Sequence, residues 1–316
     1  MSESASIPPD RSGAYGRGLH LLAIATACAV FPLIFVGAGV TSKGAGMVYA
    51  DWPTSAGHLV NPPQWWQGDH TRWEHGHRLI GWTVGFLAIG VAALSWRRGG
   101  TVRLLALATL LAIAVQGVLG GLRVTEISRG FAMIHGIWGQ MCFCLAVSVA
   151  VVSGKTWRAG SQAVEIPAGR FLRNLCVVGL VCTTIQLVLG AAYRHFGSNT
   201  ALLLHVLGAM VVTMVVGWLA MWVMGVPSGG KRPVQLGGVI AALVALQLLL
   251  GGFAFTVKVM GGAWSPLILW AVPTAHVAVG ALLLATLVAL TLLTFRLFSP
   301  SMQPVKERGT GSVAGV

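Results

Sequence analysis

The chain has 316 residues, of which 55% are hydrophobic and only 9% are charged. Soluble domains carry about 25% charged residues, so this composition excludes an ordinary soluble protein and predicts a chain solvated mostly by lipid. The formal net charge of +13 comes from Lys and Arg residues that stand in short clusters between apolar segments. Such clustering is typical of membrane topology, so nucleic acid is not an expected partner.

Eight apolar segments are long enough to cross a bilayer, because a transmembrane helix needs about 20 residues. In chain order they cover residues 18–40, 76–95, 102–121, 131–152, 172–193, 200–223, 235–257 and 268–294. We therefore predict an all-α integral membrane protein with eight transmembrane helices. The first segment has no clear signal-peptide cleavage site and is interpreted as the first span.

The basic residues between the spans predict the orientation, because cytoplasmic loops are enriched in Lys and Arg. Twice as many of the 21 basic residues lie on the side of both termini as on the other side. We predict that both termini are cytoplasmic and that the protein lies in a bacterial inner membrane. The longest connection, about residues 41–74, is then outside, and its tryptophans predict that it lies along the membrane surface.

All the cysteines lie inside apolar segments, where they are interpreted as small packing residues. They are Cys28, Cys142, Cys144, Cys176 and Cys182. None stands in a loop with the spacing of a disulfide or of a CxxC metal site.

Two repeated patterns indicate an internal duplication. The third, fifth and seventh spans contain the motif Q-x-x-L-G-[GA], which begins at Gln116, Gln186 and Gln247. Small residues there would allow close approach of another helix or of a flat ligand. The second, fourth, sixth and eighth spans each carry a histidine in their first turns, and these residues are His77, His135, His205 and His276.

These repeats predict two pseudo-symmetric four-helix bundles, at residues 18–153 and 172–295. A cytoplasmic linker, 154–171, joins them, and residues 1–17 and 296–316 form cytoplasmic tails. Each bundle contributes one histidine pair near the outer surface.

The four histidines favour heme over other metal chemistry. Zinc or copper needs three or four ligands converging on one point, and a proton relay needs acidic residues deep in the spans, where this sequence has none. Heme needs only one or two axial imidazoles and a broad apolar pocket. The sequence thus predicts up to two hemes, although a single such histidine could also be a helix-to-helix hydrogen bond.

Glu74 distinguishes the two halves. It precedes His77 by three residues and therefore shares its helix face, whereas no acid lies near His205. One interpretation is that the first site does chemistry and the second carries electrons. The alternative is that Glu74 caps the helix and pairs with Arg78.

Over about residues 18–294, the chain resembles the heme A synthase family, which consists of cytochrome oxidase assembly proteins. The similarity rests on E-x-x-H-R at Glu74–Arg78, on the histidine of each even-numbered span, and on the Asp51-Trp52-Pro53-Thr54 stretch. Some members carry a cysteine pair in the first outer loop, and this sequence lacks it. The extra His58, His70 and His75 do not fit the family pattern and are interpreted as exposed loop residues, with transient contact to heme or metal as the alternative. The role of His195 stays open.

The resemblance implies an oxidoreductase that converts heme O to heme A. The C8 methyl group would become a formyl group through successive hydroxylations and loss of water. His77 and His135 would ligate the substrate heme, His205 and His276 would ligate a heme b cofactor, and Glu74 would be the catalytic carboxylate.

The resemblance also implies partners. Arg78 and Arg194 would pair with heme propionates, since guanidinium groups suit carboxylates. A heme O synthase (protoheme farnesyltransferase) would supply the substrate, an electron-transfer partner would be required, and a homo-oligomer is considered. Two alternatives remain: a diheme b-type electron-transfer cytochrome, and a non-catalytic heme-binding assembly protein.

Overall fold

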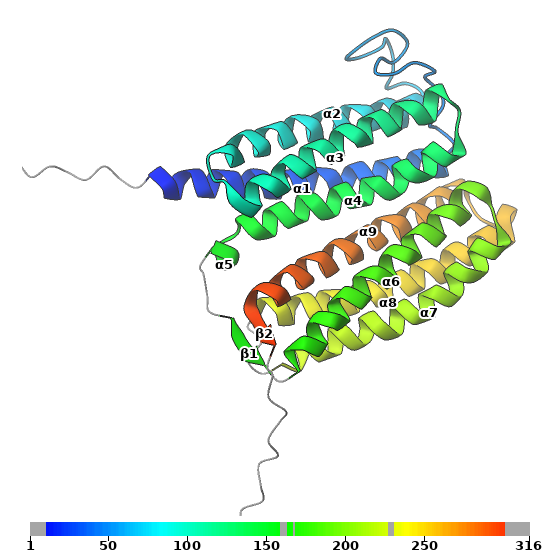
Figure 1. Ribbon diagram of the computed structural model, residues 1–316. Coiled ribbons are helices and arrows are strands. Elements are labelled where there is room, and N and C mark those ends of the chain that lie inside the picture. Colours follow the sequence, from blue (N-terminus) through cyan, green and yellow to red (C-terminus); the bar gives the residue numbers. More distant parts are fainter. Residues whose placement is uncertain (1–10, 159–162, 167, 227–230, 301–316) are drawn as a thin grey trace, which may run out of the picture.

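The computed structural model describes residues 11–158, 163–166, 168–226 and 231–300, and two groups of four long helices dominate it (Figure 1). The first group comprises α1 (Arg11–Ser42), α2 (Asp69–Trp96), α3 (Gly100–Thr125) and α4 (Arg129–Ser153). The second comprises α6 (Gly169–Phe196), α7 (Asn199–Met224), α8 (Lys231–Met260) and α9 (Pro266–Leu297). All eight are long and apolar enough to cross a membrane, so the predicted all-α fold with eight spans is confirmed.

The helices extend beyond the apolar segments from which they were predicted. Helix α2 begins at Asp69, in a polar stretch, and α4 and α7 begin after Ser128 and Ser198. These two serine hydroxyls accept hydrogen bonds from the N–H groups of Phe131 and Ala201, as N-cap residues do. Hydropathy marks only the lipid-facing part of a helix, so it places the ends too far inward.

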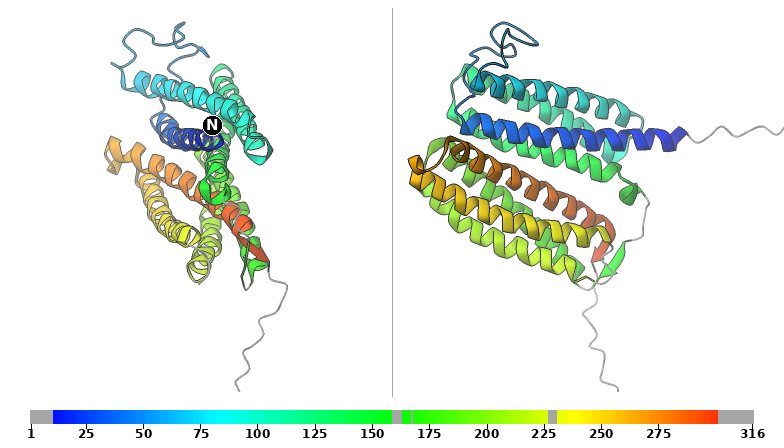
Figure 2. Two further views of the ribbon diagram at one scale, coloured as in Figure 1. Left: turned by 90° about the vertical axis from the view of Figure 1, so that its left-hand side faces the viewer. Right: turned by 180° about the vertical axis from the view of Figure 1, so that it is seen from behind.

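The two groups meet along a seam in which α9 is central. An apolar cluster joins Val30, Val84 and Phe143 of the first group to Ala281 and Leu284 of the second. Helix α9 packs against α1, α4, α6 and α8, and it is the most buried of the eight spans. The rear view in Figure 2 shows α9 between α1 and α8.

Four short elements were not predicted from the sequence. They are α5 (Lys155–Arg158), β1 (Val164–Ile166), the 3-10 turn η1 (Gly261–Ala263) and β2 (Phe298–Pro300). Strands β1 and β2 pair in parallel, with Val164 opposite Phe298, so the predicted linker is tied to the segment that follows α9. The outermost parts of the predicted tails, residues 1–10 and 301–316, lie outside the described residues.

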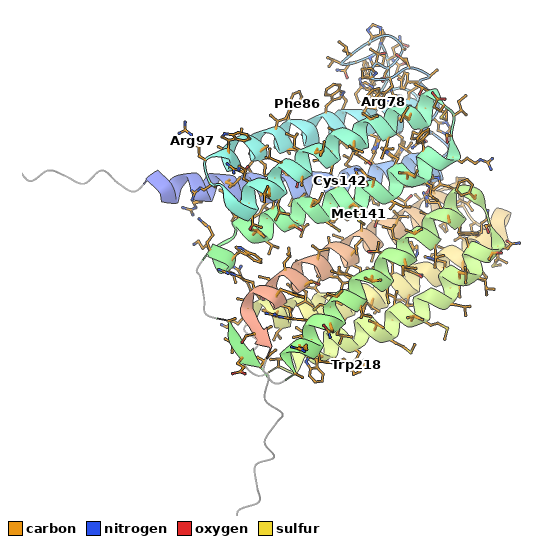
Figure 3. The ribbon with its side chains drawn as sticks, viewed as in Figure 1. Arg78, Phe86, Arg97, Met141, Cys142 and Trp218 are labelled. Carbon is orange, nitrogen blue, oxygen red and sulfur yellow. The ribbon has the colours of Figure 1, made fainter. Side chains whose placement is uncertain are left out.

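All five cysteines are free, and Cys28, which the sequence interpreted as a packing residue, is exposed. Cys142, labelled on α4 in Figure 3, is buried, as are Cys144 and Cys176. Figure 3 also shows that Arg78 and Arg97 lie toward opposite ends of α2, with Arg78 beside the long connection to α1. Below, the end that carries the four histidines is called the histidine end, and the end that carries Arg97 is called the basic end.

Candidate functional site

The four histidines form two pairs, one in each helix group. The ring centres of His77 (α2) and His135 (α4) are 6.3 Å apart, and the ring planes cross at 75°. The ring centres of His205 (α7) and His276 (α9) are 6.2 Å apart, and their planes cross at 84°. The two pairs share no residue, so this common geometry belongs to the repeated four-helix unit.

This separation suits one iron atom between two imidazoles. Bonds from a metal to an imidazole nitrogen are about 2 Å long, so two of them, together with the offset of each nitrogen from its ring centre, span on the order of 6 Å. Among the described residues, no group of three or more His, Cys, Asp and Glu side chains could hold a metal ion. The donors present therefore fit axial ligation of heme and not a zinc or copper cluster.

In the first group, each histidine ring lies against a glycine of the preceding span. A Cβ atom at Gly37 (α1) would stand 2.7 Å from Cε1 of His77, and one at Gly120 (α3) would stand 3.1 Å from Cε1 of His135. A side chain at Gly37 would force the His77 ring to shift, and one at Gly120 would require the His135 ring to give by a few tenths of an ångström.

The second group repeats this arrangement. A Cβ atom at Gly190 (α6) would lie 2.8 Å from Cε1 of His205, and one at Gly251 (α8) would lie 3.0 Å from Cε1 of His276. Three of the four glycines are the fifth residue of the Q-x-x-L-G motif. The imidazole ring of the next span therefore packs against the glycine of the motif, which explains why a glycine recurs at this position.

The glutamine of the same motif also contacts the next span. Gln116 donates through Nε2 to the carbonyl oxygen of His135 at 3.0 Å, and Gln186 donates to that of His205 at 2.7 Å. Nε2 of Gln247 lies 3.4 Å from Nε2 of His276. The first span differs, because Leu33 stands four residues before Gly37 where the others have glutamine.

Several polar atoms at the two pairs are buried without a hydrogen-bond partner in the described part of the chain. They are Nδ1 of His77, His135 and His276 and Oε1 of Gln116, Gln186 and Gln247. Buried polar atoms in folded proteins nearly always have a partner. Their concentration at both histidine pairs is what a site built around a ligand would show.

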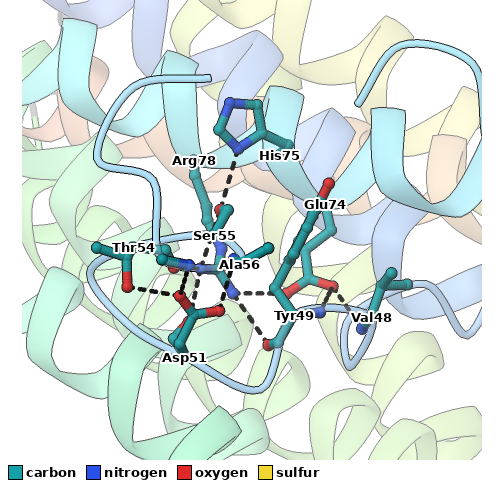
Figure 4. A network of polar contacts seen from close by, with 10 residues as sticks. Val48, Tyr49, Asp51, Thr54, Ser55, Ala56, Glu74, His75 and Arg78 are labelled. Atoms are coloured by element: carbon teal, nitrogen blue, oxygen red, sulfur yellow. Dashed lines mark hydrogen bonds and ion pairs between the residues drawn. The ribbon is translucent and has the colours of Figure 1, made fainter. Parts of the chain in front are cut away.

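Glu74 is buried, with 4% of its surface exposed, and both of its oxygens are engaged (Figure 4). Oε2 accepts the N–H groups of Val48 and Tyr49 at 2.7 and 3.3 Å. Oε1 accepts a guanidinium N–H of Arg78 at 2.7 Å. The pairing with Arg78 that the sequence left open is thus present, but the cap position of α2 is held by Gly68. Glu74 instead fastens the long connection to α2.

Both arginines predicted to bind propionates have partners within the protein. The Arg78 guanidinium also donates to the carbonyls of Asp51, Thr54 and Tyr49. Arg194 donates to the carbonyl of Ala38 and to the hydroxyl of Ser42, both at 2.8 Å, and so ties α6 to the end of α1. Their pairing with heme propionates stays a prediction.

The interpretation of His75 as an exposed loop residue is wrong. His75 lies in α2 and is only 2% exposed, with Nδ1 at 3.0 Å from the Ser55 hydroxyl and Nε2 at 3.2 Å from Oδ1 of Asn61. The error arose because α2 begins at Asp69 and the connection folds back over its first turns. His58 is an exposed loop residue, as predicted, and His70 is exposed but belongs to the first turn of α2.

The long connection is also stabilised by internal hydrogen bonds, and it packs against α3. The Asp51 carboxylate accepts hydrogen bonds from the Thr54 hydroxyl and from the N–H groups of Gly57 and Ala56. These bonds, that of Thr54 foremost, lower the pKa of Asp51 to about 2. A Cβ atom at Gly121 of α3 would stand 2.7 Å from the Trp52 ring, so this tryptophan covers the helix closely.

Two further residues near the first pair were not assigned a role from the sequence. Arg123, in the last turn of α3, is close enough to act electrostatically on both His77 and His135. His195 reaches α4 from α6, since a Cβ atom at Gly136 would stand 3.8 Å from its Nε2. The sequence did contain a signal for Arg123. It follows the motif glutamine Gln116 by seven residues, and the equivalent position in α8, seven residues after Gln247, is Ala254.

Part of the chain is similar in sequence to known proteins. Residues 67–202 match the family model COX15-CtaA, described as a cytochrome oxidase assembly protein. Over this region the chain is similar to the COX15-CtaA family. The COX15-CtaA match contains Glu74, His77 and His135 but ends before His205, so it covers the first histidine pair and not the second.

Two curated heme A synthases are similar to the chain. The one from Symbiobacterium thermophilum is 29% identical over 194 residues, and the match covers 58% of this chain and 62% of that protein. The one from Shouchella clausii is 34% identical over 192 residues, with the same coverage of 58% and 62%. A protoheme IX farnesyltransferase of Halobacterium salinarum is 28% identical over 152 residues, which are 46% of this chain and 31% of that protein. The chain thus spans less than two thirds of the length of these relatives.

Proposed function

We propose that this protein is a heme A synthase. It would be a membrane oxidoreductase that converts the C8 methyl group of heme O to a formyl group and so provides heme A for cytochrome oxidase. The observation that carries the proposal is the pair of equivalent histidine sites, each with the separation that one axially ligated iron requires. The family match and the similarity to named heme A synthases support it.

The two sites would have different roles. His77 and His135 would ligate the substrate heme O, while His205 and His276 would ligate a heme b that supplies electron transfer. Three features occur at the first pair and support this division: the buried Glu74, the positive charge of Arg123, and the long connection anchored on α2 and α3. In the second group, the 3-10 turn at Gly261–Ala263 connects α8 to α9.

Glu74 would be the catalytic carboxylate of the first site. Oxidation of a methyl group withdraws electrons and protons from the reacting carbon. A fixed carboxylate nearby can accept a proton or stabilise developing positive charge. The ion pair with Arg78 keeps this carboxylate in one position, three residues before His77 on the same helix.

The cellular setting follows from the same proposal. The protein would lie in a bacterial inner membrane with both termini in the cytoplasm and the histidine end outside. A heme O synthase would supply the substrate, and an electron-transfer partner would reoxidise or reduce the second site.

Extraction of heme from the purified protein tests this function. We expect heme O, a hydroxylated derivative or heme A, together with heme b, when extracted heme is separated by chromatography and identified by mass. Heme b alone, even when a heme O synthase is co-expressed, would support the diheme electron-transfer cytochrome instead.

The substitution Glu74→Ala tests the role of the carboxylate. We expect the variant to retain heme and to lose heme A production. Because Glu74 also holds the long connection, His75→Ala is the matched control: it removes another buried anchor of that connection without removing a charge. Full activity of Glu74→Ala would contradict the catalytic role. Equal losses of heme A production in the two variants would show that Glu74 only holds the long connection in place.

A further inference from the structure

A basic pocket lies at the end of the molecule opposite the histidines, where the two helix groups meet. A cavity of about 220 Å³ there is bordered by His20 (α1), Gly154 and Arg232 (α8). A neighbouring cavity of about 280 Å³ shares His20 and adds Arg17, Leu21, Lys155 and Arg158. We call the two together the seam pocket.

Among the described residues, the ion pairs lie away from the cations of the seam pocket. The ion pairs among the described residues join Lys43 and Arg72 to Asp69 and Arg78 to Glu74, all at the histidine end. In the part of the chain that the structure describes, no carboxylate therefore pairs with the basic side chains of the pocket. Arg158 lies directly against Gly16 of α1, which brings its charge close to the start of the first span. Like charges held together in this way repel each other unless an anion joins them.

The remaining walls of the seam pocket are mostly apolar. Val147 and Val151 of α4 and Leu293 of α9 line the first cavity, and Leu21, which lines the second, is 58% exposed. The wall also contains one polar contact, in which Nδ1 of His20 lies 3.1 Å from the hydroxyl of Ser153. A ligand for this site would combine a negative charge with an apolar body.

We infer that the seam pocket binds the phosphate headgroup of an anionic phospholipid. The pocket lies at the basic end of the eight long apolar helices, which the proposed orientation places at the cytoplasmic headgroup level. Basic pockets between membrane-spanning helices on the cytoplasmic side hold acidic lipids. The headgroup would lie between Arg158 of α5 and Arg232 of α8, with acyl chains along the surface near Leu21. Arg158 directly follows the first helix group and Arg232 lies in the second, so a bound lipid would also hold the two groups together.

Lipid binding to the purified full-length protein tests the inference. The protein is freed of native lipid in detergent, and phosphatidylglycerol, phosphatidylcholine of the same chain length, or inorganic phosphate is added. Retained lipid is counted by native mass spectrometry, and the thermal midpoint is followed. We expect phosphatidylglycerol to bind at least tenfold more tightly than phosphatidylcholine, to raise the midpoint, and to bind more weakly at high salt.

A pair of double variants tests the location. Each basic residue near an anionic lipid strengthens binding about fivefold, so Arg158→Gln with Arg232→Gln should weaken phosphatidylglycerol binding by roughly 25-fold. The control is Arg97→Gln with Arg103→Gln, which removes the same charge on the same side but outside the pocket. If the control variant weakened phosphatidylglycerol binding equally, the lipid would be held by the general positive charge of this end and not by the seam pocket. Equal binding of the two lipids, or displacement by an equal concentration of inorganic phosphate, would overturn an anionic lipid as the ligand.

Discussion

Each of the four histidine rings lies so close to a glycine that a Cβ atom there would stand within about 3 Å of the ring. Gly251 and Gly252 are adjacent in α8, yet only Gly251 faces the His276 ring, whereas a Cβ atom at Gly252 would meet nothing within 4 Å. The repeated motif made the glycines visible in the sequence. Which glycine of a Gly-Gly pair faces the ring depends on helix rotation, which the motif does not specify.

The substitution Gly251→Ala should weaken heme binding in the second group. The new methyl group would stand 3.0 Å from Cε1 of His276, and overpacking of this kind costs about 1–3 kcal/mol. We expect heme content, measured by the pyridine hemochrome spectrum, to fall in Gly251→Ala. Gly252→Ala, whose methyl group meets open space, is the control, and unchanged heme in both variants would show that the ring is free to move.

At the scale of elements, the sequence predicted the eight spans well because length and hydropathy are strong, local signals. It did not predict β1 and β2, because strands as short as Val164–Ile166 and Phe298–Pro300 have no periodicity to detect. The fold of the long connection could not be predicted from the sequence either. Its anchors, Glu74 and His75, lie in α2, and their partners precede them by more than a helix turn in sequence. Only three-dimensional packing brings such residues together.

The glutamine contacts between neighbouring helices lead to a prediction at this scale. Gln247→Leu should remove the contact between α8 and His276 and speed loss of heme from the second group. A hydrogen bond contributes about 0.5–1.5 kcal/mol, so we expect at most about a tenfold faster transfer of heme to apomyoglobin. Gln235→Leu, an exposed position at the start of the same helix, is the control. Heme transfer as slow as in the unsubstituted protein would show that Gln247 does not position the histidine.

For the whole molecule, the internal duplication predicts that the two sites are separable. The halves nevertheless contact each other at the histidine end, where Arg194 of α6 bonds to Ala38 and Ser42, and Thr274 of α9 bonds to the same serine at 3.0 Å. The sequence indicated two halves but not these contacts, because no motif marks a residue that reaches across a seam.

The substitution His205→Ala tests the division between the halves. We expect it to remove heme b, because the variant lacks one of the two histidines proposed to hold that heme, while heme O and its products stay bound in the first group. His77→Ala should have the opposite effect. The hemes in each variant are extracted and separated by chromatography. An unchanged heme b content in His205→Ala would mean that the second histidine pair does not hold heme b.

Helix α9 has a consequence for how the protein is made. It is the last long helix to leave the ribosome among the described spans, yet it packs against α1, α4, α6 and α8 and supplies His276. Until it inserts, the faces of α1, α4 and α6 that it covers remain open to lipid, and His205 has no opposing ring. Closure of the seam and completion of the second histidine pair are therefore one event, which cannot take place until α9 has inserted.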